Sequence, residues 1–148
     1  MVDKWEVKRG LADAINDHDV PRMLDIFSED ATYVSPVGVA EGSEQIVWLF
    51  EQFFRGFPDL YLAVWYEATS TDNPLVVEWT AVGTHTGPFL LPDGRDLEPT
   101  GRRITLRGTC ASFVDDDGKI GTHREYFDQL ELYSQLGLHL EMGESAVA

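Results

Sequence analysis

Residues 115–138, DDDGKIGTHREYFDQLELYSQLGL, decide the fold of this chain. The stretch opens with Asp117-Gly118, which predicts a type I′ hairpin turn because glycine readily adopts the positive φ that the turn requires. The residues after the turn predict a strand from about 120 to 132. Most of the remaining second half of the chain also has the residue pattern that is typical of strands.

Ionisable side chains interrupt this predicted strand. Because side chains alternate along a strand, His123, Glu125 and Phe127 share one face. Arg124 and Asp128 share the opposite face, where we expect them to form an ion pair under a layer of helices. The rest of the segment has the pattern of interior sheet, so the sequence predicts that His123 and Glu125 point into a pocket.

Length and composition indicate one domain, residues 1–148, with a full hydrophobic core. The net charge of −15 would repel phosphate backbones and anionic membranes, so we expect no nucleic-acid partner and no membrane partner. No segment approaches the roughly 20 apolar residues of a membrane helix. Cys110 is the one cysteine, and the N-terminus has no apolar run typical of a signal peptide. These features favour a cytoplasmic protein.

The order of predicted elements is α+β. Apolar spacing predicts three N-terminal helices, at about 3–17, at 20–27 after a cap at Asp19, and at 44–56 after a cap at Ser43. Strands are predicted at 31–35, 60–69, 75–85 and 103–114, with a loop at 87–101 and a frayed end at 140–148. We expect the helices to cover one face of a strongly curved, mostly antiparallel sheet and a cavity to lie on the other face.

Four motifs in order resemble the SnoaL-like polyketide cyclases, also called ester cyclases, of the nuclear-transport-factor-two-like superfamily. They are GFPDL at 56–60, GTHTGPF at 83–89, PTGRR at 99–103 and DGKI…HREYFDQL…QLG at 117–137. The resemblance implies a cone-shaped barrel, wrapped by the three helices, that encloses a pocket. It also implies carboxylate acid/base catalysis without a cofactor, and a homo-oligomer (dimer or tetramer) formed through the open sheet face.

Individual site residues follow from this resemblance. Glu125 takes the position of the family's acid/base carboxylate, which directly follows the arginine of an HR pair and is usually aspartate. His123 lies beside it on the inner face and is the second catalytic candidate. Ser35 matches a pocket asparagine, whereas Ala111 stands where the cyclases have a catalytic histidine.

Aromatic side chains are the other predicted lining of the pocket. Trp65, Trp79, Phe113 and Phe127 would form a flat, hydrophobic slot for a small polyketide-like substrate, although aromatics at such positions are usually plain core. Because an apolar cavity solvates a carboxylate poorly, we expect the pKa of Glu125 to rise from about 4.3 toward neutrality. Such a base would suit enolisation of an acidic carbon between two carbonyls.

Two other functions stay open at this point. The departure at Ala111, together with Trp79, is compatible with a non-catalytic small-molecule-binding module. The last strand also resembles that of limonene-type epoxide hydrolases. In those enzymes a tyrosine at the position of Tyr33 holds the attacking water, but Trp79 and Ala81 replace their arginine and second aspartate.

The alternative without catalysis is that Glu125 forms a structural ion pair with Arg124, His123 or another cation. A metal site is not predicted, because His123 and Glu125 supply two ligands and the sequence offers no convincing third.

Overall fold

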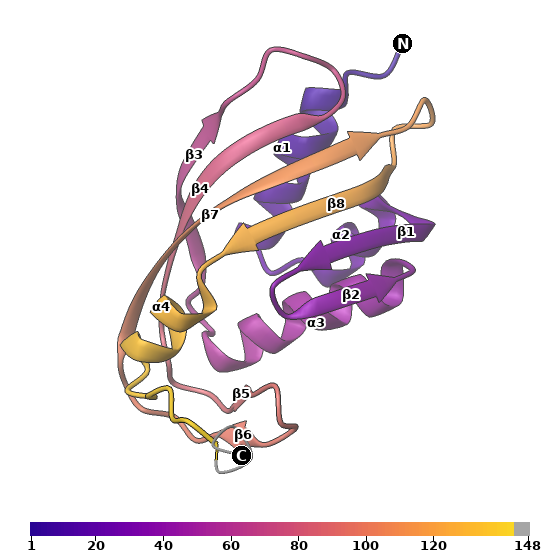
Figure 1. Ribbon diagram of the computed structural model, residues 1–148. Coiled ribbons are helices and arrows are strands. Elements are labelled where there is room, and N and C mark those ends of the chain that lie inside the picture. The colour runs from indigo at the N-terminus through magenta and orange to yellow at the C-terminus, as the bar shows by residue number, and fades with distance from the viewer. Residues whose placement is uncertain (144–148) are drawn as a thin grey trace.

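Three N-terminal helices lie together on one face of a six-stranded sheet in the computed structural model, which describes residues 1–143 (Figure 1). The strand order is β2-β1-β8-β7-β4-β3, and every neighbouring pair is antiparallel except β1 and β8, which are parallel. The prediction of an α+β fold is confirmed. The elements are α1 (Lys4–Asn16), α2 (Val20–Ile26), β1 (Phe27–Ser35), β2 (Gly38–Glu41), α3 (Ser43–Gly56), β3 (Tyr61–Glu67), β4 (Leu75–Thr84), β5 (Phe89–Leu90), β6 (Asp96–Leu97), β7 (Arg103–Val114), β8 (Ile120–Phe127) and α4 (Gln129–Gln135).

Local capping explains where the helices begin. The Asp3 carboxylate accepts the backbone N–H groups of Trp5 and Glu6 at the start of α1, and Asp19 caps α2 as predicted. Ser43 does not cap α3. It is the first helical residue, and the cap is Gly42, whose φ of 87° suits a residue without a side chain.

The long strands fix the site through their register. In β4 the side chains of Val77, Trp79 and Ala81 are buried, as their alternation predicts. In β7 and β8, Cys110 pairs with Glu125 and Ser112 pairs with His123. Four of the polar side chains described below therefore come from two adjacent strands at matched positions.

The end of β8 differs from the prediction. The strand stops at Phe127, and Asp128 leaves the sheet to cap α4, its carboxylate accepting the N–H of Glu131 at 3.1 Å. The expected ion pair of Arg124 with Asp128 is therefore wrong, because one residue is in the sheet and the other is a helix cap. The predicted type I′ turn is also wrong, since among the described non-glycine residues only His18 has a positive φ and Asp117 does not.

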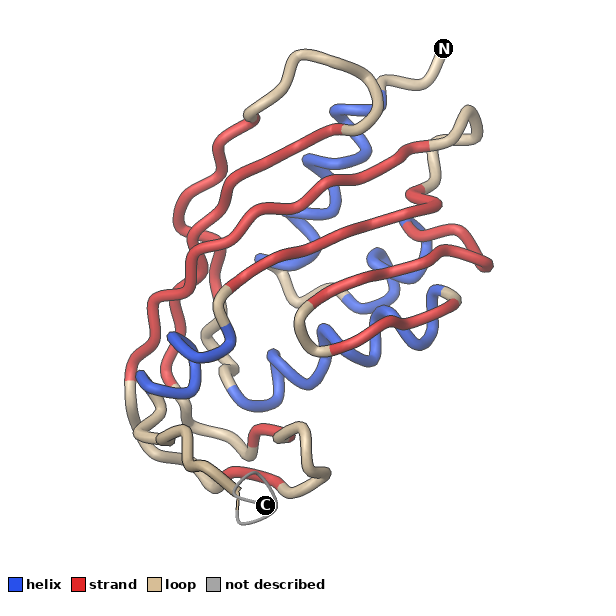
Figure 2. Tube along the Cα trace, viewed as in Figure 1, coloured by secondary structure: helices blue, strands red, loops and turns tan. Residues whose placement is uncertain are grey.

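The helices and the inner side chains of the sheet share one interior, which corrects the expectation of a cavity on the face away from the helices. One buried cluster joins α1, α2 and α3 to β1, and a second surrounds β4, β7 and α4. Figure 2 shows the two short strands β5 and β6, inside the predicted loop, at the end of the molecule where α4 also lies. Residues 140–143 form no helix or strand, and the rest of the predicted frayed end, 144–148, lies outside the described residues. No described helix is long and apolar enough to cross a membrane.

Gly108 provides a test of this packing, because it pairs with Trp79 across β4 and β7. A Cβ at Gly108 would overlap the Trp79 ring and would lie 2.6 Å from the Tyr126 carbonyl oxygen. We expect Gly108→Ala to lower the free energy of unfolding by about 1–3 kcal/mol, the usual cost of overpacking. Gly121→Ala is the control, because its Cβ would meet only Ser28 Oγ at 4.0 Å. Equal stability of the two variants in urea denaturation would contradict this account.

Candidate active site

A cavity of about 60 Å³ lies between α1, α3 and the inner face of the sheet. Its walls are largely apolar and include Leu11, Phe50 and Leu106. Tyr33, Cys110, His123 and Glu125 bring the ionisable groups to the same cavity. In such surroundings each polar group interacts more strongly with its neighbours than it would in water.

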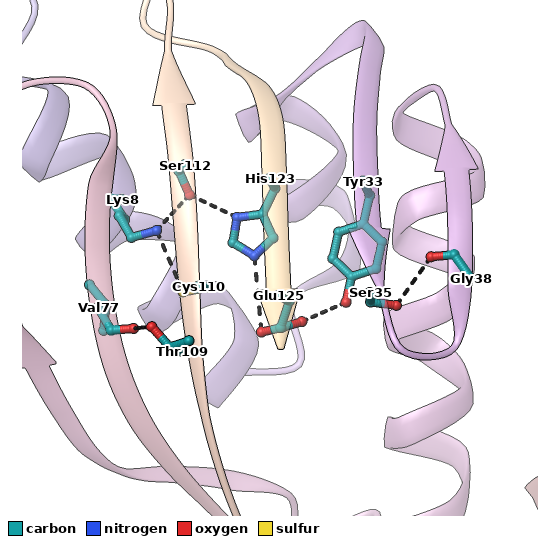
Figure 3. Close-up of polar contacts among 10 residues, drawn as sticks. All are labelled: Lys8, Tyr33, Ser35, Gly38, Val77, Thr109, Cys110, Ser112, His123 and Glu125. Carbon is teal, nitrogen blue, oxygen red and sulfur yellow. Dashed lines mark hydrogen bonds and ion pairs between the residues drawn. The ribbon is translucent and has the colours of Figure 1, made fainter. Parts of the chain in front are cut away.

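The Glu125 carboxylate is held at the cavity wall from two sides (Figure 3). The Tyr33 hydroxyl donates to Oε2 at 2.5 Å, and His123 Nε2 lies 4.0 Å from Oε1. The second distance is too long for a hydrogen bond, so the two groups face each other across a narrow gap. The side chain of Glu125 is 13% exposed, which removes most of its contact with water.

His123 is buried between an aromatic ring and a hydroxyl. The Tyr33 ring stacks on its imidazole with an interplanar angle of 7°, and Ser112 Oγ lies 2.7 Å from Nδ1. Ser112 Oγ in turn accepts a hydrogen bond from Lys8 Nζ at 2.6 Å. Because an ammonium group only donates, the Ser112 hydroxyl proton is left for His123 Nδ1, which assigns the imidazole proton to Nε2 on the Glu125 side.

The sequence interpretation missed Ser112 and, with larger consequences for the site, Lys8. Its side chain has no exposed surface, and it lies on the inner face of α1. The sequence did hold a signal. Lys8 is three residues before Leu11 and seven before Ile15, so it belongs to the apolar stripe of the helix and not to its polar face.

Burial and neighbouring charges set the ionisation of these groups. Burial alone would raise the pKa of Glu125, but the charge that His123 gains when it is protonated, the Tyr33 hydroxyl and the Lys8 charge together hold it below its usual value. The expectation of a pKa near neutrality is therefore wrong. Burial lowers the pKa of His123, which keeps the imidazole neutral, and raises the pKa of Tyr33 well above its usual value. The site thus holds an ionised carboxylate beside a neutral imidazole.

Cys110 adds a third group that metal ions could use, since its Sγ and donor atoms of His123 and Glu125 lie within 4.8 Å of one another. The surroundings do not fit a metal ion. Lys8 Nζ lies 3.5 Å from Cys110 Sγ, so a positive charge is already present. Burial raises the pKa of the thiol to about 12, whereas a metal ligand must be a thiolate.

Comparison with known proteins assigns the family. The family model of the SnoaL-like polyketide cyclases matches residues 6–136. The chain belongs to this family. No curated protein matches it. The assignment to the family therefore rests on the family model, and the solved structures provide evidence for the fold.

Solved structures of similar shape agree with the family fold. IdmH of Streptomyces antibioticus, provisionally assigned as a polyketide cyclase, gives a TM-score of 0.75 at 24% identity, over 93% of this chain and 100% of its own. A SnoaL-like protein of Jannaschia sp. CCS1, with the same provisional assignment, gives 0.78 at 21% identity over 93% of each chain. AclR of Streptomyces galilaeus, provisionally assigned as a hydroxylase, gives 0.74 at 20% identity over 97% and 87%. At these identities the likeness shows the fold alone.

The structure brings most of the predicted site residues of this SnoaL-like chain together. Glu125, His123, Tyr33, Trp79 and Phe127 all line the cavity, and so does the predicted Trp65. Ser35 does not line it. Its hydroxyl is engaged in the turn after β1, where it accepts the N–H of Val37 and donates to the carbonyl oxygen of Gly38.

Ala111 and Phe113 do not line the cavity, which corrects two predicted positions. Both lie on the outer face of β7, and Phe113 is 39% exposed. The inner face of this strand carries Cys110 and Ser112, because the buried positions are the even-numbered ones. The sequence alternates apolar Ile104 and Leu106 with polar Thr105 and Arg107. This alternation predicts that the even-numbered positions of the strand face inward.

The burial of neutral His123 predicts a dependence of stability on pH. Because its pKa in the folded chain lies below the ordinary 6.5, the unfolded chain binds more protons as the pH falls below that value. The free energy of unfolding should therefore decrease on acidification from pH 6.5 to about 5. His123→Gln should flatten this part of the curve, as measured by urea denaturation at a series of pH values.

His85, whose pKa burial also lowers, should supply part of the remaining slope in the variant. Exposed His139 is the matched control, and His139→Gln should keep the slope of the original chain. The same steep decrease in the His123→Gln chain would show that His123 is not buried in its neutral form.

Proposed function

We propose that this SnoaL-like chain is a cofactor-independent cyclase or isomerase that acts on a small, mostly apolar, carbonyl-bearing substrate of the polyketide type. Glu125 is the acid/base group, and His123 is a hydrogen-bond donor to the substrate. One observation carries the proposal: the Glu125 carboxylate lines a largely apolar cavity, and His123 Nε2 lies 4.0 Å from its Oε1 atom.

The reaction begins with removal of a proton. The Glu125 carboxylate takes the proton from a carbon between two carbonyl groups, and the enolate oxygen accepts the Nε2–H of His123. The enolate carbon then attacks a second carbonyl carbon of the same molecule, which forms one C–C bond and an alkoxide. Glu125 returns its proton to the alkoxide, so the carboxylate is regenerated and no electrons enter or leave.

The low pKa of Glu125 narrows the substrate class. A carboxylate that is easily ionised is a weak base, so it suits only carbon acids whose anion is delocalised over two carbonyls. An unactivated ketone would not be deprotonated at a useful rate. The same low pKa makes protonated Glu125 a strong acid, which favours rapid return of the proton to the alkoxide.

Two adjoining spaces would hold the substrate. The inner cavity of about 60 Å³ is smaller than the roughly 300–1,000 Å³ of typical ligand pockets. A groove of about 320 Å³ lies beside it, between α3, α4 and the β5–β6 hairpin. Val37, Leu49 and Phe53 line both spaces. We therefore place the reacting carbonyls in the inner cavity and the rest of the substrate in the groove, with these three side chains at the junction.

Glu125→Gln should reduce turnover by at least about 100-fold, because the amide cannot accept the proton. The measurement is NMR detection of ring closure, and of C–H exchange in D₂O, with a panel of aromatic 1,3-dicarbonyl esters. Exposed Glu51 on α3 is the matched control, and Glu51→Gln should keep full activity. Activity retained by a folded Glu125→Gln chain would remove Glu125 from the mechanism.

A non-catalytic binding module is the second candidate, favoured by the apolar Trp79 and Ala81 at the cavity wall. It predicts saturable binding of the same esters with neither ring closure nor exchange. Diol formation from simple epoxides would instead support an epoxide hydrolase with a rearranged site.

We also propose that two copies associate through the outer face of the sheet. Tyr66, Glu78, Thr109 and Tyr126 form one continuous row across β3, β4, β7 and β8, and both tyrosines are more than half exposed. A monomer in sedimentation velocity at micromolar concentration would remove this proposal.

A further inference from the structure

We propose that Lys8 is a positioning residue of the site, which fixes the Nε2–H form of His123 through Ser112 and supplies the counter-charge of Glu125. The inference rests on the proposed acid/base role of Glu125 and identifies what keeps that site in its reactive state. Lys8 does not itself line the cavity. It acts through Ser112 on His123, which does line the cavity.

The position of Lys8 is unusual for a lysine. Its side chain is fully buried on the inner face of α1, and Nζ contacts Ser112 Oγ at 2.6 Å and Cys110 Sγ at 3.5 Å. Lysine is almost never fully buried unless it is paired. No salt bridge of Lys8 occurs in the described part of the chain, so its counter-charge is met at longer range, by Glu125.

The chain of donors runs in one direction because its first member cannot accept. The Lys8 ammonium donates to Ser112 Oγ, and the single hydroxyl proton of Ser112 then points to His123 Nδ1. Nδ1 therefore carries no proton, and Nε2–H faces Glu125 (Figure 3). If Lys8 were neutral or absent, Ser112 could accept from Nδ1–H instead, and the imidazole would present a bare Nε2 to the substrate.

The ionisable groups that face His123 come from four elements. They are Lys8 of α1, Cys110 of β7, Glu125 of β8 and Tyr33 of β1. Burial keeps the pKa of the Cys110 thiol at about 12 and that of the Tyr33 hydroxyl well above 10.0. At neutral pH, Lys8 and Glu125 therefore carry the two opposite charges of this buried site.

A purely structural lysine would behave differently in a test. Replacing a buried ion by an apolar residue of similar size is often neutral or stabilising, so stability alone does not separate the two roles. The tautomer of His123 does, because scaffolding by Lys8 would not require any particular proton position on the imidazole.

The test is imidazole ¹H–¹⁵N correlation NMR of the full chain and of Lys8→Met. We expect Nε2–H as the single form of His123 in the original chain and a mixture with Nδ1–H in the variant. The pKa of His123 should also rise in Lys8→Met, because the repelling Lys8 charge is gone. Lys119→Met is the control, because Lys119 is partly exposed and contacts Asp25, and its replacement removes the same charge. His123 should be unchanged in the control.

A second measurement uses the original chain, in case Lys8→Met does not fold. Burial lowers the pKa of Lys8 below 10.5, so its deprotonation should release the tautomer and shift the His123 nitrogen signals at alkaline pH. Constant His123 signals from pH 7 to 10.5 would overturn the inference. So would an unchanged tautomer and pKa of His123 in folded Lys8→Met.

The outcome is independent of the proposed reaction, because the NMR readout needs no substrate. An inactive Glu125→Gln chain combined with an unaltered His123 in Lys8→Met would keep the catalytic role of Glu125 and remove the role of Lys8. In the active chain we further expect Lys8→Met to move the acid limb of the kcat/KM profile to higher pH, because Glu125 loses a stabilising charge.

Discussion

Lys8 and Glu125 carry opposite charges inside an interior whose remaining walls are largely apolar. Removing an ion from water costs several kcal/mol, so neither charge is stable there without the other and without hydrogen bonds to its remaining sites. Ser112 and His123 span the distance between the two charges, and Tyr33 satisfies the far oxygen of the carboxylate. Each link comes from a different element or strand position, so the network forms only when the helix and the three strands are in register.

The same arrangement explains which chemistry the site can support. The pKa of Glu125 lies below its usual value, so the carboxylate is ionised over the whole physiological pH range. For the same reason it is a weak base. The apolar cavity compensates by strengthening the interaction of the carboxylate and of the His123 Nε2–H with a bound substrate. The proposed substrate, a carbon acid activated by two carbonyls, would meet both conditions. The chain belongs to the SnoaL-like polyketide cyclase family.

Sequence patterns predicted the α+β order, the family and the shared inner face of His123 and Glu125, because strand alternation is a local property. They missed what depends on tertiary surroundings. They gave Lys8 no role, although it lies on the apolar stripe of α1. Phe113 was placed inward because it is aromatic, although the alternation of β7 turns it outward. Asp128 was assigned to the strand, although it caps α4. The packing of α4 on β7 determines where the strand ends, and the local sequence pattern does not show that packing.

The ionisation state of Glu125 determines which chemistry the cavity can support, and the carboxyl ¹³C signal of Glu125 reports that state. The signal is assigned by its absence in Glu125→Gln and followed through a pH titration of the full chain. The account predicts that Glu125 titrates below the ordinary value of 4.5 and stays ionised at neutral pH. A Glu125 carboxyl that titrates above that value, and remains protonated toward neutrality, would contradict it.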